Sequence, residues 1–435
     1  WRRCEYDENG RLVKEITPFM DSTPDEPENR HNIILYSYEP LHPDEDTAGY
    51  FTRPRTIIRQ ALGQETGRNY RLYFADEAWE ITAAAPGAAY DAPENRVSKH
   101  YSYPDGTFKG RPWKTENADG TTVITTYREL GDSLETTTES GFLPDYGSRT
   151  VSVINGRGNV VSTRTYDIET GLLISGGDST YDQYGRVLTR TDIDGQTTVT
   201  EYNCCGPRFV TQPDGSITEY AYDVFNRLKF ENYAGITTWH AYDADNNEIR
   251  TTVTGKEGGE LITLREYDTD GKLIREVNPA GAETHYARGS GWEQVTDALG
   301  GIQRTEYYRD GNRKSISGTA AFPSEFLYGV ESNELTSKQL TPPSGWVENF
   351  TNFLGQQYKT LYSDGFAETS RFDAFGRPVA NENTDGQKRL TIYDPASGKE
   401  KYQVLKRSNN SDEIDWQHDS VTLFDSGYVE REGKV

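Results

Sequence analysis

Apolar and polar residues alternate along most of the chain in runs of about six, separated by glycine or asparagine turns. In YDQYGRVLTRTDIDGQTTVTEYN, residues 181 to 203, the runs RVLTRT and QTTVTEY each follow a turn. A period of two in runs rich in Thr, Val and Tyr predicts β-strands, and an Asp-Gly turn between two strands predicts a hairpin. No stretch keeps the spacing of an amphipathic helix, and 41 Gly and 19 Pro interrupt nearly every window. We therefore expect an all-β chain with very little helix.

Two turn signals recur at fixed spacing, which indicates an internal repeat. A glycine precedes an aromatic residue by seven positions at Gly120 to Tyr127, Gly195 to Tyr202, Gly215 to Tyr222, Gly235 to Tyr242, Gly301 to Tyr308, Gly365 to Phe372 and Gly386 to Tyr393. Four residues after an aromatic stand Gly10, Gly185, Gly206, Gly271 and Gly376, or Asn226 and Asn246, which also tolerate a left-handed backbone. Aromatic residues 181, 202, 222 and 242 are 21, 20 and 20 residues apart. Each repeat of about 20 residues is therefore predicted to be one hairpin of a continuing antiparallel meander.

The regularity of the repeats divides the chain into two parts. Residues 1–100 are interpreted as an irregular part of the array, with one unit at 6–12 and long loops in the Pro- and Glu-rich stretch that follows. Residues 101–435 are interpreted as the repeat array itself. Neither part has the composition of a flexible linker, so one continuous architecture is favoured. Because the chain starts with Trp1 rather than Met, we expect it to be a fragment of a longer protein.

Residues that recur in every repeat are predicted to be structural. The aspartates that follow the repeat aromatics are Asp7, Asp167, Asp182, Asp223, Asp243, Asp268, Asp373 and Asp394. We expect them to accept turn N–H groups or to pair with the arginine that follows, because a catalytic acid would appear once or twice and not in each repeat. The predicted structural set is Tyr181, Asp182, Gly185, Arg186, Gly195, Tyr202, Tyr222, Asp223, Tyr242, Asp243, Tyr267, Asp268, Gly271, Phe372, Asp373, Gly376, Tyr393 and Asp394.

The charge of the chain excludes several partner classes. With 46 Lys and Arg against 69 Asp and Glu, the net charge is −23, which repels nucleic-acid backbones and anionic lipid. No apolar run approaches the roughly 18 residues needed to span a bilayer, so this segment is not expected to insert into a membrane. The 3 cysteines, Cys4 and the adjacent Cys204 and Cys205, lack the spacing of a zinc site and are interpreted as tolerated thiols.

Candidate chemistry is confined to acidic turns and exposed aromatic residues. Oxygen ligands spaced like fragments of a calcium loop occur at Asp192, Asp194, Asp243, Asp245, Asp268 and Asp270, although turn formation explains the same residues. Calcium is therefore only a weak candidate, and no other cofactor is expected. Tryptophans 79, 113, 239, 292, 346 and 416 could stack on sugar rings, or could pack within the sheet. No Ser-His-Asp grouping or GxSxG motif is present, and no carboxylate pair stands out, so we expect no enzyme activity.

The repeat turns suggest a family. YDENGRL, YDQYGRV, YDVFNRL, YDTDGKL and FDAFGRP resemble the YD repeats of Rhs proteins, of the C components of insecticidal toxin complexes and of teneurin ectodomains. The resemblance covers residues from about 100 to the end, together with residues 6 to 12. It implies a long antiparallel sheet that spirals into a hollow shell with tyrosine ladders. A β-propeller or a β-solenoid would also hide the edges of such a meander.

In toxin members of this family the shell encloses a C-terminal segment, whereas in teneurins it presents surfaces for adhesion. YDPASGKEKY at Tyr393 resembles only the beginning of the family's self-cleaving C-terminal core, so no catalytic residue is carried over. The leading hypothesis is a structural shell or scaffold segment of a large secreted or cell-surface protein, bacterial by resemblance. Its expected partners are other segments of the same polypeptide, such as a C-terminal cargo. The alternative is an adhesin that binds glycans or cell-surface proteins; a polysaccharide-acting enzyme is the third reading.

Overall fold

The computed structural model describes residues 1–435 except 50, 395–397, 408–410, 426–427 and 435, and contains 36 strands. They are β1 (Arg3–Tyr6), β2 (Leu12–Thr17), β3 (Asn32–Ser37), β4 (Thr56–Ala61), β5 (Gln64–Tyr73), β6 (Glu77–Thr82), β7 (Arg96–Ser102), β8 (Pro112–Glu116), β9 (Thr122–Leu130), β10 (Ser133–Phe142), β11 (Tyr146–Ile154), β12 (Val160–Asp167), β13 (Leu173–Tyr181), β14 (Val187–Asp192), β15 (Thr197–Tyr202), β16 (Pro207–Thr211), β17 (Ile217–Tyr222) and β18 (Leu228–Tyr233). The second half comprises β19 (Ile236–Tyr242), β20 (Glu248–Thr254), β21 (Glu260–Tyr267), β22 (Leu273–Val277), β23 (Glu283–Gly289), β24 (Trp292–Thr296), β25 (Ile302–Tyr307), β26 (Arg313–Ser317), β27 (Ser324–Glu331), β28 (Glu334–Thr341), β29 (Gly345–Thr351), β30 (Gln357–Tyr362), β31 (Ala367–Phe372), β32 (Pro378–Asn383), β33 (Lys388–Tyr393), β34 (Glu400–Leu405), β35 (Ser420–Asp425) and β36 (Tyr428–Lys434).

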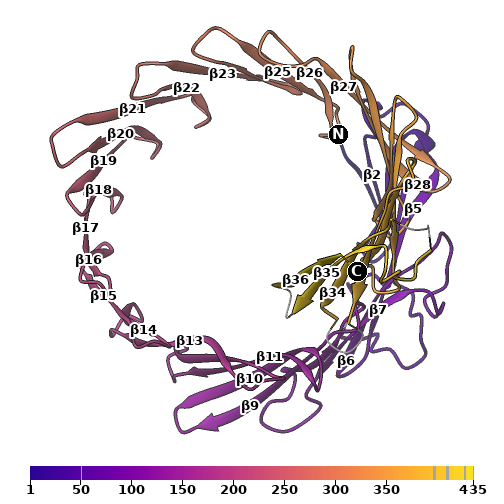
Figure 1. Ribbon diagram of the computed structural model, residues 1–435, viewed down its shortest axis with the longest axis horizontal. Helices are drawn as coiled ribbons and strands as arrows, with labels where there is room; N and C mark the ends of the chain where they lie inside the picture. Colours follow the sequence, from indigo (N-terminus) through magenta and orange to yellow (C-terminus); the bar gives the residue numbers. More distant parts are fainter. Residues whose placement is uncertain (50, 395–397, 408–410, 426–427, 435) are drawn as a thin grey trace.

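These strands form one antiparallel meander in which each strand pairs with the next along the chain. The sheet curves into an open ring and passes beyond a full turn, and the last strands, β34 to β36, lie inside the ring in this view (Figure 1). Within the described residues, helix is limited to one 3-10 turn, Glu28–Arg30. The predicted fold class, an all-β hairpin meander with very little helix, is confirmed.

The two turn signals of the sequence form the same five-residue loop. In the loop from Asp182 to Arg186 the end residues are joined by an Asp182 N–H to Arg186 carbonyl bond of 2.9 Å, and the fourth residue has φ +81°. Asp192 and Gln196 close an identical loop at 3.0 Å, with Gly195 at φ +79°. This is a turn followed by a left-handed glycine, which needs three loop residues and produces a bulge. Asp194 and Gly195 are thus the third and fourth residues of a five-residue loop, and the predicted hairpin forms between β14 and β15.

One repeat was assigned in the wrong register. The loop from Asp297 to Gly301 has its left-handed glycine at Gly300, with φ +79°, and the strand that follows it ends at the aromatic residue Tyr307. The predicted pair of Gly301 and Tyr308 is therefore shifted by one position. Tyr308 instead begins the next loop, at the position that aspartate takes elsewhere, because its N–H bonds the carbonyl of Asn312. Two neighbouring glycines and two neighbouring tyrosines made both registers possible in the sequence.

Because consecutive strands run antiparallel, their connections alternate between the two edges of the sheet. We call the edge with the connections that follow odd-numbered strands the odd edge, and the opposite one the even edge. Seven of the eight repeat aspartates begin odd-edge loops, whereas Asp167 ends β12 and begins an even-edge loop. The loop that starts with Asp192 also lies on the even edge.

A seam joins the second turn of the ring to the first. After β25, Asp310 accepts a 2.6 Å hydrogen bond from the Met20 N–H, in the connection after β2, and Lys314 lies 2.6 Å from Asp21. After β27, Asn333 donates its backbone N–H to the Gln64 side chain at 2.8 Å, just after the turn that follows β4. The odd edge of the second turn therefore lies on the even edge of the first.

Aromatic rings continue the seam. Phe353, after β29, packs against the buried cluster of Tyr70, Leu72, Ile81 and Ala83, and Ala83 lies in the connection after β6. Phe375, after β31, lies 3.0 Å from where a Cβ on Gly120 would stand, in the connection after β8. The paired connections follow β25 and β2, β27 and β4, β29 and β6, and β31 and β8, which is an offset of 23 strands each time.

Two alanine substitutions separate seam packing from turn strain. Gly120 and Gly281 occupy the same loop position on the even edge at φ +82° and +80°, but nothing lies within 4 Å of a Cβ at Gly281. Both Gly120→Ala and Gly281→Ala should therefore cost about 1–2 kcal/mol from the left-handed backbone. Only Gly120→Ala must also displace the Phe375 ring, so it should show the larger loss in urea unfolding followed by tyrosine fluorescence. Equal losses would contradict the seam contact.

Burial is concentrated where a second layer covers the sheet. One core cluster consists of Tyr70, Leu72, Ile81 and Ala83, and another of Ala380, Leu390, Val404 and Val421. Long connections contribute Leu41, Tyr90 and Ile414 to these clusters, and the connections near β5 and β7 lie on the outer side of the ring (Figure 1). From residue 98 to 251 no residue is buried and none packs against either core cluster, as expected where the wall is a single layer.

Candidate functional site

The repeat loops form a connected cluster along the odd edge. Asp223 accepts the N–H groups of Phe225 at 2.8 Å and Arg227 at 3.0 Å through Oδ1, and the Arg227 Nε at 2.7 Å through Oδ2. Arg227 also reaches the next odd-edge loop, where it donates to the Asp243 carbonyl at 3.1 Å, and its guanidinium lies 4.6 Å from the ring centre of Tyr242. One arginine therefore ties its own loop to the following one.

The same arrangement recurs where aspartate and arginine are four residues apart. Asp182 and Arg186 are 2.6 Å apart, and Arg186 lies over the Tyr202 ring at 4.4 Å and bonds the Asn203 carbonyl at 3.0 Å. Asp7 with Arg11, and Asp373 with Arg377, are built alike. Partial burial alone would raise the pKa of Asp182, but the hydrogen bonds from its loop and from Arg186 hold that pKa below its usual value.

Tyrosine hydroxyls supply a second link between odd-edge loops. Tyr242 donates to the Leu228 carbonyl at 3.0 Å, Tyr267 to the Glu248 carbonyl at 3.1 Å and Tyr393 to the Pro378 carbonyl at 3.0 Å. Each acceptor is the first residue after the preceding odd-edge loop. Burial raises the pKa of Tyr242, Tyr267 and Tyr393, which keeps these hydroxyls protonated as donors.

Replacing Arg227 with Lys tests the loop-to-loop link. Lysine keeps the positive charge but loses the fork that bonds Asp223 and the Asp243 carbonyl together, and it stacks less well on Tyr242. We expect the thermal unfolding midpoint to fall by about 2 °C. Lys272→Arg is the matched control, since Lys272 stands four residues after Asp268 and bonds it through the backbone N–H at 2.9 Å. That variant should raise the midpoint or leave it unchanged.

The structure divides the calcium candidates into two groups. Asp192, Asp243 and Asp268 use Oδ1 to accept two N–H groups of their own loops, at 2.8 to 3.0 Å. Asp194, Asp245 and Asp270 stand at the exposed third position of those loops. Among the residues that the structure describes, no three His, Cys, Asp or Glu side chains are placed to hold a metal ion together. Asp192, Asp243 and Asp268 therefore cap the turns of their own loops.

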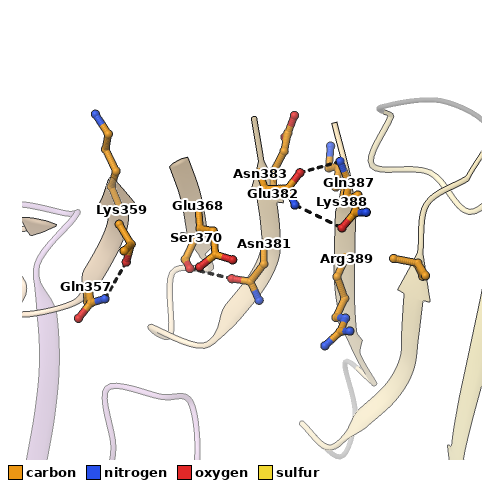
Figure 2. A pocket seen from close by; sticks show the side chains of 12 residues that line it. Gln357, Lys359, Glu368, Ser370, Asn381, Glu382, Asn383, Gln387, Lys388 and Arg389 are labelled. Carbon is orange, nitrogen blue, oxygen red and sulfur yellow. Dashed lines mark hydrogen bonds between the residues drawn. The ribbon is translucent and has the colours of Figure 1, made fainter. Parts of the chain in front are cut away.

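A polar hollow of about 430 Å³ lies on β30 to β34 (Figure 2). Ser370 donates to Asn381 at 2.7 Å, and the Asn383 amide donates to Gln387 at 3.3 Å. Lys388 is 5% exposed and lies 2.5 Å from Asp412. Amides, hydroxyls, basic groups and the carboxylates of Glu368 and Glu382 line the hollow. The hollow thus offers polar contacts of both charges.

The tryptophans, for which stacking on sugars and packing within the sheet were both considered, contact groups of this chain. Trp239 lies 4.9 Å from the Phe230 ring centre, and Trp416 lies 5.5 Å from Tyr402. The other ring or cation contacts are Trp79 with Phe74, Trp113 with Tyr101, Trp292 with Arg304 and Trp346 with Lys338. Cys204 and Cys205 lie in the short connection after β15 as free thiols. No helix among the described residues is both long and apolar enough to cross a bilayer.

Sequence reasoning missed the long-range contacts of the wall. The seam pairs Asp21 with Lys314 and Gln64 with Asn333, and no local pattern marks these residues. The contact of Arg227 with Tyr242 could have been predicted from the sequence. An arginine in the loop and an aromatic residue at the end of the next repeat also occur at Arg186 and Tyr202, which are in contact as well.

Comparisons with known proteins support the fold. No protein-family model and no curated protein matches the sequence. The crystal structure of TcdB2-TccC3 matches with a TM-score of 0.63 at 12% identity, over 98% of this chain and 28% of that chain. The Tc holotoxin pore of Photorhabdus luminescens matches at 13% identity over 95% of this chain and 27% of that chain, with a TM-score of 0.35.

The first of these matches establishes a shared fold. At a TM-score of 0.63 the ring of hairpins corresponds to a stretch of the TcdB2-TccC3 chain, and it spans 28% of that chain's length. This agrees with the resemblance of the repeat loops to toxin-complex proteins. At 12% identity the likeness concerns the fold and carries no residue roles.

Proposed function

We propose that this chain is a wall segment of a hollow β-shell and acts as a container or scaffold within a large secreted toxin-complex-like protein. The observation that carries the proposal is the ring itself, a sheet of 36 strands that closes past one turn around an open centre (Figure 1). No residue from 98 to 251 is buried or packs against a core cluster, which leaves this part of the wall available to other segments. The fold shared with the TcdB2-TccC3 chain supports the same role.

The proposed role is not catalytic and needs no cofactor. The repeated Asp, Arg and Tyr side chains form hydrogen bonds that hold neighbouring loops together. Such bonds suit a wall that must keep its curvature without a filled core. The partners of the inner face would be other segments of the same polypeptide.

Single-particle electron microscopy of the full-length protein that contains this chain tests the proposal. We expect a curved wall with density from other segments inside it. Removal of the seam ion pair by Lys314→Met should loosen that wall and increase protease cleavage of the enclosed segments, whereas Lys272→Met, away from the seam, should not. An empty interior with the remaining segments outside would contradict the container role.

A further inference from the structure

Four tryptophans of the strands lie on one face of the sheet. Directly paired residues place their side chains on the same face, as do residues two positions apart along a strand. Followed from one strand pair to the next, this rule puts on the face of Leu72 the side chains of Trp79, Trp239, Trp292 and Trp346. Long connections pack Leu41 and Tyr90 against the cluster of Leu72, and they run along the outer side of the ring (Figure 1). The four tryptophans therefore lie on the outer face.

A cation of this chain covers three of these four rings. The distances from cation to ring centre are 3.9 Å for Lys99 and Trp79, 4.2 Å for Arg304 and Trp292, and 3.7 Å for Lys338 and Trp346. No cation of the described residues lies over Trp239, which is 43% exposed. Within the same residues its ring contact is with Phe230, at 4.9 Å between ring centres. Trp239 is thus the outer-face tryptophan with ring surface left for a ligand.

Arg250 stands where a cation would cover Trp239. Arg304 and Lys338 each stand two residues before the residue that is paired with their tryptophan. Arg250 likewise stands two residues before Thr252, which is paired with Trp239. The Arg250 Nε instead donates to the Thr252 hydroxyl at 3.1 Å, which draws the guanidinium away from the ring. The same strand geometry therefore leaves an open place here that is filled at the other two tryptophans.

The uncovered ring lines a hollow of about 330 Å³ on the outer face. Ala241 and Thr252 contribute small side chains to it, and Arg250 and Glu260 lie on opposite sides of Trp239 along the strands. The outer nitrogens of Arg250 and the carboxylate of Glu260 bond no other described residue. Small-molecule sites commonly have volumes of about 300–1,000 Å³ and a few polar groups that fix orientation. The hollow has both properties, with an aromatic wall in addition.

We propose that this hollow binds one pyranose ring, of a free sugar or of a glycan. The C–H face of a pyranose is apolar and can stack on the indole of Trp239, while its hydroxyls accept from Arg250 and donate to Glu260. A cationic ligand would also stack on indole, but the Arg250 guanidinium repels it, and Glu260 repels an anion. A neutral ring with hydroxyls is compatible with both charges. The site concerns what the wall displays, so it is independent of the container role.

NMR spectra of the tryptophan indole N–H groups test the proposal directly. Titration with methyl β-glucopyranoside should move one of the 7 indole signals, the one that is missing from the spectrum of Trp239→Phe. The dissociation constant should be about 1–10 mM, since the ligand has few atoms. Glycerol, which has hydroxyls but no ring, should move no signal. No shift at about 50 mM sugar, or a shift of other indoles instead, would overturn the proposal.

Cellotetraose distinguishes the two sources of the ring. If it moves the same signal, the ring can belong to a glycan chain; if only the methyl glucoside does, the ligand is a free sugar.

Substitutions at the two ends of the hollow test how the ring is held. Arg250→Ala and Glu260→Ala should each weaken binding by about threefold or more, because each removes a hydrogen bond to the sugar. Glu201→Ala, which removes an exposed carboxylate from the same face in β15, is the matched control and should bind as wild type does. All three side chains are exposed, so the thermal midpoints should stay close to that of the wild type. If Arg250→Ala bound the sugar as tightly as wild type or more tightly, Arg250 would be a competing cover for Trp239, and the proposed site would be wrong.

Discussion

Replacing Glu45 with Gln is expected to reduce the free energy of unfolding by about 3–5 kcal/mol, because it leaves the Arg55 guanidinium charged in a dry site. The side chains of Arg55 and Glu45 are 2% and 0% exposed and lie 2.7 Å apart. Glu45 also accepts the N–H groups of Leu41 and His42, at 2.6 and 3.0 Å. Burial of both charges is compensated only while every partner is present.

Urea unfolding, followed by tryptophan fluorescence, measures this loss. Glu80→Gln is the control, since its pair with Arg71 spans 3.4 Å and both side chains are about half exposed, at 56% and 44%. An exposed pair of this kind contributes less than about 1 kcal/mol. If Glu45→Gln cost no more than Glu80→Gln, the buried pair would not be holding the connection between β3 and β4.

Replacing Asp419 with Asn should loosen the connection that covers the second core cluster and remove part of the acid sensitivity of the chain. Asp419 and Lys406 are 0% and 1% exposed and 2.5 Å apart. Asp419 also accepts the N–H groups of Arg407 at 2.9 Å and Asp415 at 2.8 Å. Loss of the carboxylate leaves Lys406 buried without its counter-charge, at a cost of about 3–5 kcal/mol.

The pH dependence follows from the direction of the pKa shift. Burial alone would raise the pKa of Asp419, but Lys406 and the two backbone N–H groups lower it strongly. A carboxylate with a depressed folded pKa stabilises the fold above its unfolded pKa of about 3.9, and this stability is lost as the pH falls towards the folded value. Thermal midpoints from pH 5 downwards should therefore fall more steeply in wild type than in Asp419→Asn. Parallel curves would contradict this assignment.

The hairpins were predictable from single residues. Asn226 and Asn246 take φ +65° and +71° in loops where glycine stands in other repeats, as their tolerance of the left-handed region implies. The error in register came from the same local signals, because Gly300 beside Gly301 left two registers open. Only strand pairing distinguishes these possibilities.

The residue types of the candidate site could be predicted from the sequence, but the contacts between its loops could not. Recurrence identified Asp223 and the arginine four residues later, yet the contact of Arg227 with Tyr242 requires two odd-edge loops to lie side by side. The buried pairs of Glu45 with Arg55, and of Asp419 with Lys406, lie in irregular connections, where no period marks a partner. These side chains are ordinary acids and bases, and they affect the free energy of unfolding strongly only because they are buried.

The hairpins, their loops and the antiparallel meander could be predicted from the amino-acid sequence, because alternation and left-handed turn residues act within about ten residues. The closure of the meander after 23 strands, the contact of Met20 with Asp310, and the exposure of Tyr184 and Phe225 beside the packed Phe375 emerge only in the folded chain. The curvature that brings these residues together accumulates from a small twist at each strand pair. No short window of the sequence shows this accumulated curvature.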